Sequence, residues 1–85
     1  MKVTLFNNIS PNSEIIVIAQ NRCPESLLRM CNVPDEARSY IKNCTDAVLL
    51  NNEGIFVRGI NSSFYEVEIN KEKYFVHEQY VRRDI

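Results

Sequence analysis

The 85-residue sequence is poor in the residues that build catalytic and metal centres. Its only histidine is His77, and no Cys-x-x-Cys pair occurs among Cys23, Cys31 and Cys44. A zinc site is not expected, because such sites hold the metal with closely spaced thiolates. A Cys-His nucleophilic pair remains arithmetically possible. We expect instead that His77 is satisfied structurally and that the cysteines are small hydrophobic residues on the inner sides of helices. We therefore predict no enzyme activity, no metal and no cofactor.

A charge excess and long apolar runs are also missing. Ten Lys and Arg against eleven Asp and Glu give a formal net charge of -1, so the sequence lacks the basic footprint of a nucleic-acid binder. The longest apolar run, residues 15–19, is too short to cross a bilayer, and residues 1–6 are too short for a signal-peptide core. We expect a cytoplasmic protein with three reduced thiols and no membrane contact.

Length and composition are those of one small globular domain. A chain of this length holds one core, and 45% apolar with 25% charged residues is ordinary for a globular protein. No repeat or linker is visible, so we predict a single domain over residues 1–85.

The most informative stretch is residues 63–81. Tyr65, Val67 and Ile69 alternate with Glu66 and Glu68, which predicts a strand with one buried face. Residues 70–73 are polar and fit a hairpin connection, and residues 74–76 return as the partner strand. Residues 77–79 then suit a single helical turn before a short closing strand at residues 80–81.

This stretch resembles a known family. The run FYEVEINKEKYFVHEQYV is similar to the C-terminal half of bacterial Src-homology-3-type (SH3b-type) domains, in which an aromatic-aromatic-Val-His-x-x-Tyr segment follows a short hairpin and closes a barrel. Phe64 stands where the family usually has Trp, and Glu72 and Lys73 replace the glycine expected at the hairpin tip. The resemblance implies a small SH3-like β-barrel and a role in targeting to cell-wall peptides.

The rest of the chain adds further strands. Residues 3–6 predict a short strand, and residues 14–20, with consecutive β-branched positions, predict a strand buried on both faces. Residues 47–50 and 55–58 predict a hairpin across the Gly-containing loop 51–54. The fold class is therefore mainly β, with six or seven short strands in an SH3-like barrel.

Two helices are predicted to interrupt the strands, as an insertion over about residues 24–43. The first, residues 24–31, has Pro24 at its first position and Leu27, Leu28 and Cys31 on one side. The second, residues 34–42, begins with Pro34 and has acidic residues in its first turn. Its apolar residues recur at helical spacing: Val33, Ala37, Tyr40, Ile41 and Cys44. The insertion is either a lid over the core or the binding element.

The period-2 pattern of the predicted strands gives an expected core. Its members are Val3, Leu5, Ile16, Ile18, Val48, Leu50, Phe56, Tyr65, Val67, Ile69, Phe75 and Val81.

With no chemistry in the sequence, the function predicted first is a non-enzymatic protein-binding module. We expect a small accessory or inhibitor protein, which a phage or mobile element could encode. Two aromatic side chains are predicted to lie partly exposed on the strand faces opposite the core, beside charges of both signs on the helices. The expected partner-binding residues are Glu25, Arg29, Arg38, Phe64 and Tyr74.

Two alternative functions remain open from the sequence. One is the cell-wall peptide-binding role that the family resemblance implies. The other is nucleic-acid binding by a small barrel, for which Arg58, Arg82 and Arg83 are few cations. The sequence leaves the oligomeric state open.

Overall fold

The computed structural model describes residues 1–83, and the fold over these residues is mainly β, as the sequence predicts. It contains eight strands, one short α-helix and two 3-10 helices. In chain order these are β1 Lys2–Leu5, β2 Glu14–Ala19, α1 Glu25–Arg29, η1 Asp35–Ala37, β3 Arg38–Lys42, β4 Thr45–Leu49, β5 Ile55–Val57, β6 Ser62–Ile69, β7 Glu72–His77, η2 Glu78–Tyr80 and β8 Val81–Arg83.

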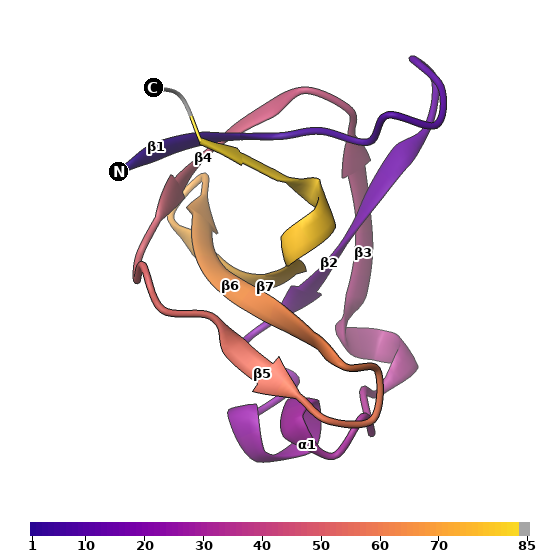
Figure 1. Cartoon of the computed structure of the whole chain (residues 1–85), viewed down its shortest axis with the longest axis vertical. Helices are drawn as coiled ribbons and strands as arrows, with labels where there is room; N and C mark the ends of the chain where they lie inside the picture. The colour runs from indigo at the N-terminus through magenta and orange to yellow at the C-terminus, as the bar shows by residue number, and fades with distance from the viewer. Residues whose placement is uncertain (84–85) are drawn as a thin grey trace.

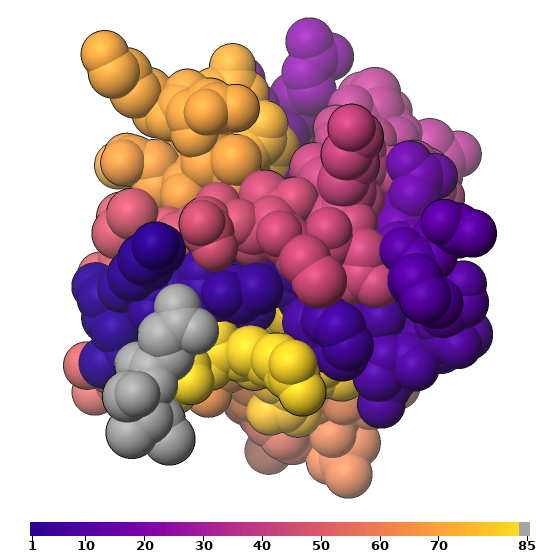
Figure 2. Space-filling model, turned by 90° about the horizontal axis from the view of Figure 1, so that it is seen from above, coloured from indigo at the N-terminus to yellow at the C-terminus, as the bar shows by residue number. Residues whose placement is uncertain are grey.

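All strands belong to one antiparallel sheet. The order across it is β3-β2-β7-β6-β4-β1-β8, and β5 pairs with β6 beside this path. The sheet curls, with β1 and β4 at one side, β3 at the other, and α1 below (Figure 1). Seen from above, β1 lies between β4 and β8 (Figure 2), in agreement with its pairing to both strands.

The predicted hairpin at the centre of the sheet is confirmed. β6 and β7 pair from Phe64 with His77 to Ile69 with Glu72. Two residues connect them, Asn70 and Lys71, with φ angles of 52° and 67°. Positive φ at both central positions is the requirement of a type I′ turn, whose twist matches that of the flanking strands. The turn is thus shorter than the predicted four residues. The helical turn η2 and the closing strand β8 follow as predicted.

The second predicted helix is wrong. Of residues 34–42, only Asp35–Ala37 are helical, as the 3-10 helix η1. Residues Arg38–Lys42 form the strand β3, which pairs with β2 from Ile18 with Arg38 to Glu14 with Lys42. The apolar spacing that suggests a helix is also compatible with an edge strand, and pairing supplies β2 with a second hydrogen-bonded neighbour. The predicted two-helix insertion therefore consists of the short helices α1 and η1, and β3 is a strand in addition to those predicted.

The predicted hairpin between residues 47–50 and 55–58 is also wrong. β4 and β5 do not pair with each other; both pair antiparallel with β6. They therefore run in the same direction along one side of β6. Residues 50–54 connect the two strands without reversing the direction of the chain. The real reversal lies after β5, where the amide of Asn61 donates to the carbonyl of Arg58 at 3.2 Å.

Two clusters of buried residues lie on opposite faces of the sheet. The first core contains Val3, Leu5, Ile15, Val17, Ala47, Leu49, Val67 and Val76. The second core contains Ile18, Cys23, Leu28, Ala37, Ile55, Val57 and Phe75. Since Leu28 belongs to α1 and Ala37 to η1, the α1–η1 segment covers the second core, and β5 closes its other side.

Several residues of the expected core lie elsewhere. Ile16, Val48, Leu50 and Phe56 are 39%, 46%, 41% and 49% exposed. In β4 and β5 the neighbouring positions point inward instead, because a strand shifted by one residue exchanges its two faces. Val3, Leu5, Ile18, Val67 and Phe75 are buried as predicted, and Tyr65, Ile69 and Val81 pack against the first core half-buried.

Asn7 and Asn43 connect the β1–β2 loop to the end of β3. The Asn43 side chain accepts from the amide of Asn7 at 2.8 Å and donates to its carbonyl at 2.7 Å. The buried Asn7 side chain donates in turn to the carbonyl of Glu14 at 3.1 Å. These bonds fix the position of β3 relative to the start of β2.

Among the helices of residues 1–83, none has the length and apolar character needed to span a membrane.

Candidate functional site

The candidate site is a groove of about 310 Å³. It lies between the α1–β3 segment and the face of the sheet that carries the second core. Apolar side chains dominate its walls. The lining residues are Ile16, Ile18, Leu28, Cys31, Val33, Arg38, Val57, Ile60, Phe64, His77, Gln79 and Tyr80. The groove therefore continues the second core outward to solvent, at the place where the covering segment ends.

Three rings form one wall of the groove. Phe64 of β6 and His77 of β7 lie edge to face with ring centres 5.4 Å apart and planes at 78°. His77 and Tyr80 of η2 follow at 6.2 Å and 65°. The hairpin register places Phe64 opposite His77, and η2 turns Tyr80 back beside them. Edge-to-face packing holds the half-buried rings in fixed orientations.

The ring of His77 is oriented by a hydrogen bond at its Nδ1. Its Nδ1 accepts from the amide of Gln79 at 3.0 Å and caps η2. A neutral imidazole that accepts at Nδ1 carries its proton on Nε2, so this ring can donate from Nε2 but cannot act there as a base. This contact gives His77 a hydrogen-bond partner within the fold.

Arg38 supplies the permanent charge among the described residues that line the groove. Its guanidinium lies 3.7 Å from the carboxylate of Asp35, whose side chain is 96% exposed. Such exposed ion pairs contribute at most about 1 kcal/mol. The guanidinium has five N–H donors, so Arg38 can bind a further carboxylate without losing this contact.

The cysteines differ from the prediction. Cys23 is buried in the second core, and burial raises the pKa of its thiol, as expected for an inert core residue. Cys31 and Cys44 are exposed and have positive φ angles of 56° and 63°, so they occupy turns and not the inner side of a helix. All three are free, and Cys31 lines the groove.

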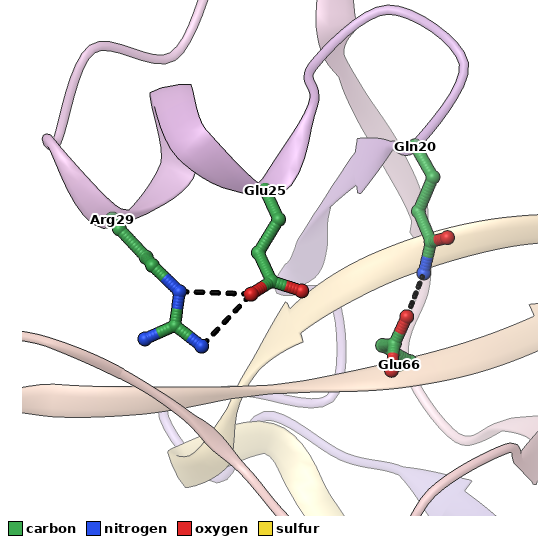
Figure 3. A network of polar contacts seen from close by, with 4 residues as sticks. All are labelled: Gln20, Glu25, Arg29 and Glu66. Atoms are coloured by element: carbon green, nitrogen blue, oxygen red, sulfur yellow. Dashed lines mark hydrogen bonds and ion pairs between the residues drawn. The ribbon is translucent and has the colours of Figure 1, made fainter.

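The predicted partner-binding residues fall into two groups. Phe64 and Arg38 line the groove, whereas Tyr74, Glu25 and Arg29 do not. Glu25 and Arg29 form an exposed ion pair of 2.8 Å along α1 (Figure 3). Pairs at this spacing contribute only a few tenths of a kcal/mol.

Tyr74 does not lie on the face predicted for it. The hairpin register pairs Val67 with Tyr74, so Tyr74 packs half-buried against the first core, whereas Phe75 belongs to the second core. Its hydroxyl donates to the carboxylate of Glu72 at 2.9 Å. This hydrogen bond, with partial burial, raises the pKa of the Tyr74 hydroxyl.

The groove is also lined by residues that were not predicted as site residues, among them Ile16, Ile60 and Tyr80. Tyr80 was assigned to the closing strand and Ile16 to the core, and Ile60 lies in the turn after β5. The signal that could have identified Tyr80 is the helical turn at residues 77–79, since such a turn redirects the side chain at its end.

A second, polar hollow lies beside the hairpin tip and is lined by Gln20, Asn21, Lys71, Glu72 and Lys73. Gln20 spans it from the end of β2, donating to the carboxylate of Glu66 at 3.4 Å (Figure 3). Its lining residues are all polar or charged, in contrast to those of the groove.

Within residues 1–83, no three His, Cys, Asp or Glu side chains gather in a way that could hold a metal ion. Comparison with protein-family models, with curated proteins and with solved structures finds no match to this chain.

Proposed function

We propose that this chain is a protein-binding module without enzymatic activity, built on an SH3-like barrel and acting as a small accessory or inhibitor protein. The barrel assignment is supported by the curled antiparallel sheet and by the helical turn that leads from β7 into β8. It is further supported by the pairing of β8 with β1, which brings the two ends of the described chain together.

The observation that carries the proposed function is the apolar groove with its ring wall and Arg38. Exposed aromatic and aliphatic side chains beside an arginine form the usual centre of a protein-protein contact. Ile60, 47% exposed, and half-buried Phe64 and Tyr80 supply the apolar surface. The groove also provides hydrogen-bond donors from Arg38 and His77, which orient a polar group of the partner.

Partner capture with matched variants tests this function. The immobilised protein is exposed to lysate and, separately, to purified cell wall; captured proteins are identified by mass spectrometry and their affinities are measured after purification. We expect a protein partner whose affinity falls at least ~10-fold with Ile60→Asp. Ile9→Asp is the control, because Ile9 is 80% exposed and lies outside the groove.

Two outcomes would contradict the proposal. Binding to cell wall without a protein partner would favour the targeting role instead. A partner that binds Ile60→Asp as tightly as the original chain would place the contact outside the groove. Alkylation gives an independent reading: a partner in the groove should protect Cys31 and leave the exposed Cys44 reactive.

A further inference from the structure

The groove is bordered by an edge of the sheet that has no strand beyond it. Among the described strands β3 pairs only with β2, and Figure 1 shows its other side free of strands. No described strand pairs with the backbone N–H and C=O groups on that side; the carbonyl of Lys42, at the end of β3, accepts from the hydroxyl of Thr45 at 2.6 Å. Unpaired edge groups are the ones used in the strand addition by which many modules bind extended peptides.

The side chains of β3 continue the groove toward this edge. Arg38 lies opposite Ile18 and Tyr40 opposite Ile16, and both isoleucines line the groove. Since side chains alternate along a strand, Arg38, Tyr40 and Lys42 point to the groove face. Tyr40 is 61% exposed and extends the apolar surface of Ile16 to the edge. In a strand added to β3, every second side chain would therefore lie next to Arg38, Tyr40 or Lys42.

The charges of β3 disfavour a second copy of the chain in the register that would stack the two Tyr40 side chains. β3 carries Arg38 and Lys42 and no acidic residue. If two copies paired antiparallel about Tyr40, Arg38 of each would face Lys42 of the other. Like charges directly opposite each other in a sheet are destabilising.

The same charges favour an acidic segment. Among residues 1–83, Arg38 forms one ion pair, the exposed one with Asp35, and Lys42 has Glu14 as its neighbour on β2. Opposite charges across paired strands are stabilising, and acidic residues two positions either side of an apolar one would face Arg38, Tyr40 and Lys42 in either strand direction.

We propose that the open edge of β3 binds an extended segment of the partner protein with the pattern acidic-x-apolar-x-acidic, as an added strand of the sheet. The apolar residue packs on Tyr40 and Ile16 at the mouth of the groove, and the two carboxylates meet Arg38 and Lys42. This inference rests on the proposed function and specifies how the partner is recognised.

Selection from a yeast-displayed library of random peptides of about nine residues tests the pattern. We expect enrichment of acidic-x-apolar-x-acidic sequences. A synthetic peptide of the enriched sequence is then N-methylated at every second amide, in each of the two registers. Strand pairing requires that one register lose at least ~10-fold in affinity while the other stays within about twofold. Backbone amides of β3 should exchange with solvent more slowly in the complex.

Charge reversal adds a rescue test. Arg38→Glu/Lys42→Glu should weaken the acidic peptide at least ~10-fold and bind a peptide with lysines in place of the acids. Arg58→Glu/Lys71→Glu is the matched control, because it changes the net charge equally at residues that belong neither to β3 nor to the lining of the groove. Thermal melting of each variant verifies that the fold is retained.

The possible failures are distinguishable. Peptides that depend on Ile60 but tolerate N-methylation in both registers would overturn strand addition and leave the proposed function intact. A library that yields no peptide above background, or only peptides without paired acids, would overturn the inference, and the capture experiment judges the proposed function separately.

Discussion

The side chain of Cys31 packs closely against the backbone of Gly59 beside the groove. A side chain on Gly59 would place its Cβ 2.5 Å from the sulfur of Cys31 and 3.4 Å from the Cys31 Cβ. The first distance is a clash and the second an ordinary contact. Neither glycine of the chain has a positive φ, so Gly59 is needed for space and not for backbone conformation.

We therefore predict that Gly59→Ala lowers the free energy of unfolding by about 0.5 to 1.5 kcal/mol, because the exposed Cys31 side chain must rotate out of its preferred conformation to make room for the new methyl group. In a Cys31→Ala background the same substitution should cost much less, because the sulfur is gone. Urea denaturation of the two single variants and the double variant measures this coupling. An equal loss in both backgrounds would show that the cost does not arise from the Cys31 sulfur.

Individual side chains were predicted where one local rule decided their position. Val67 and Tyr65 follow a clean alternation and lie on the predicted face. Phe64 is partly exposed as expected, but Tyr74 shares the face of Tyr65 because the register across the hairpin decides its direction. A connection of two residues, as observed, and one of four, as predicted, both place Tyr74 on the face of Tyr65, because side chains alternate along each strand. The predicted opposite face for Tyr74 was therefore inconsistent with the predicted hairpin itself.

At the scale of elements, the β6–β7 hairpin offers a direct test of its turn. Lys71 has φ of 67° without being a glycine, and this conformation costs a side-chain-bearing residue about 1 to 2 kcal/mol. Asn70 precedes it, so Lys71→Gly would create the Asn-Gly pair that type I′ turns prefer.

We predict that Lys71→Gly raises the free energy of unfolding by about 0.5 to 1 kcal/mol, since the relief of strain exceeds the entropy that glycine loses on folding. Lys73→Gly is the control: Lys73 lies within β7, where glycine should destabilise by a similar amount. Guanidinium denaturation measures both. If Lys71→Gly were destabilising, a turn conformation different from type I′ would be indicated.

β3 shows why one strand was missed, and β4 with β5 shows why one predicted pairing was wrong. Residues 38–42 form an edge strand whose side chains are exposed or half-buried, so β3 lacks the alternation that marks a half-buried strand. For β4 and β5, the Gly-containing loop signalled a reversal, yet both strands pair with β6. The residue types of a loop do not show whether its two flanking strands pair with each other or both pair with a third strand.

At the scale of the molecule, the two cores explain the errors in burial. Adjacent residues on one strand, Val17 with Ile18 and Phe75 with Val76, are both buried because the sheet is covered on both faces there. For β2, the continuous apolar run at residues 15–19 predicted burial on both faces. The sequence analysis assumed one core elsewhere, and the groove at the open margin of the second core was therefore not predicted.

These shared strands predict that the two cores unfold together. Val67 lies in the first core and Leu28 in the second, and both are fully buried. Val67→Ala should cost about 1 to 3 kcal/mol and Leu28→Ala about 2 to 5 kcal/mol, through lost burial and the cavity left behind.

Val48→Ala is the matched control, because Val48 is 46% exposed on β4, and its cost should stay within about 0.5 kcal/mol. Urea unfolding followed by fluorescence and by circular dichroism should give one coincident transition for each variant, because β2 and β7 contribute to both cores. If Leu28→Ala instead produced an early separate transition and left the main one unchanged, α1 would be an independently unfolding cover over the sheet. The groove would then open on the side of α1 without unfolding of the strands that form its other walls.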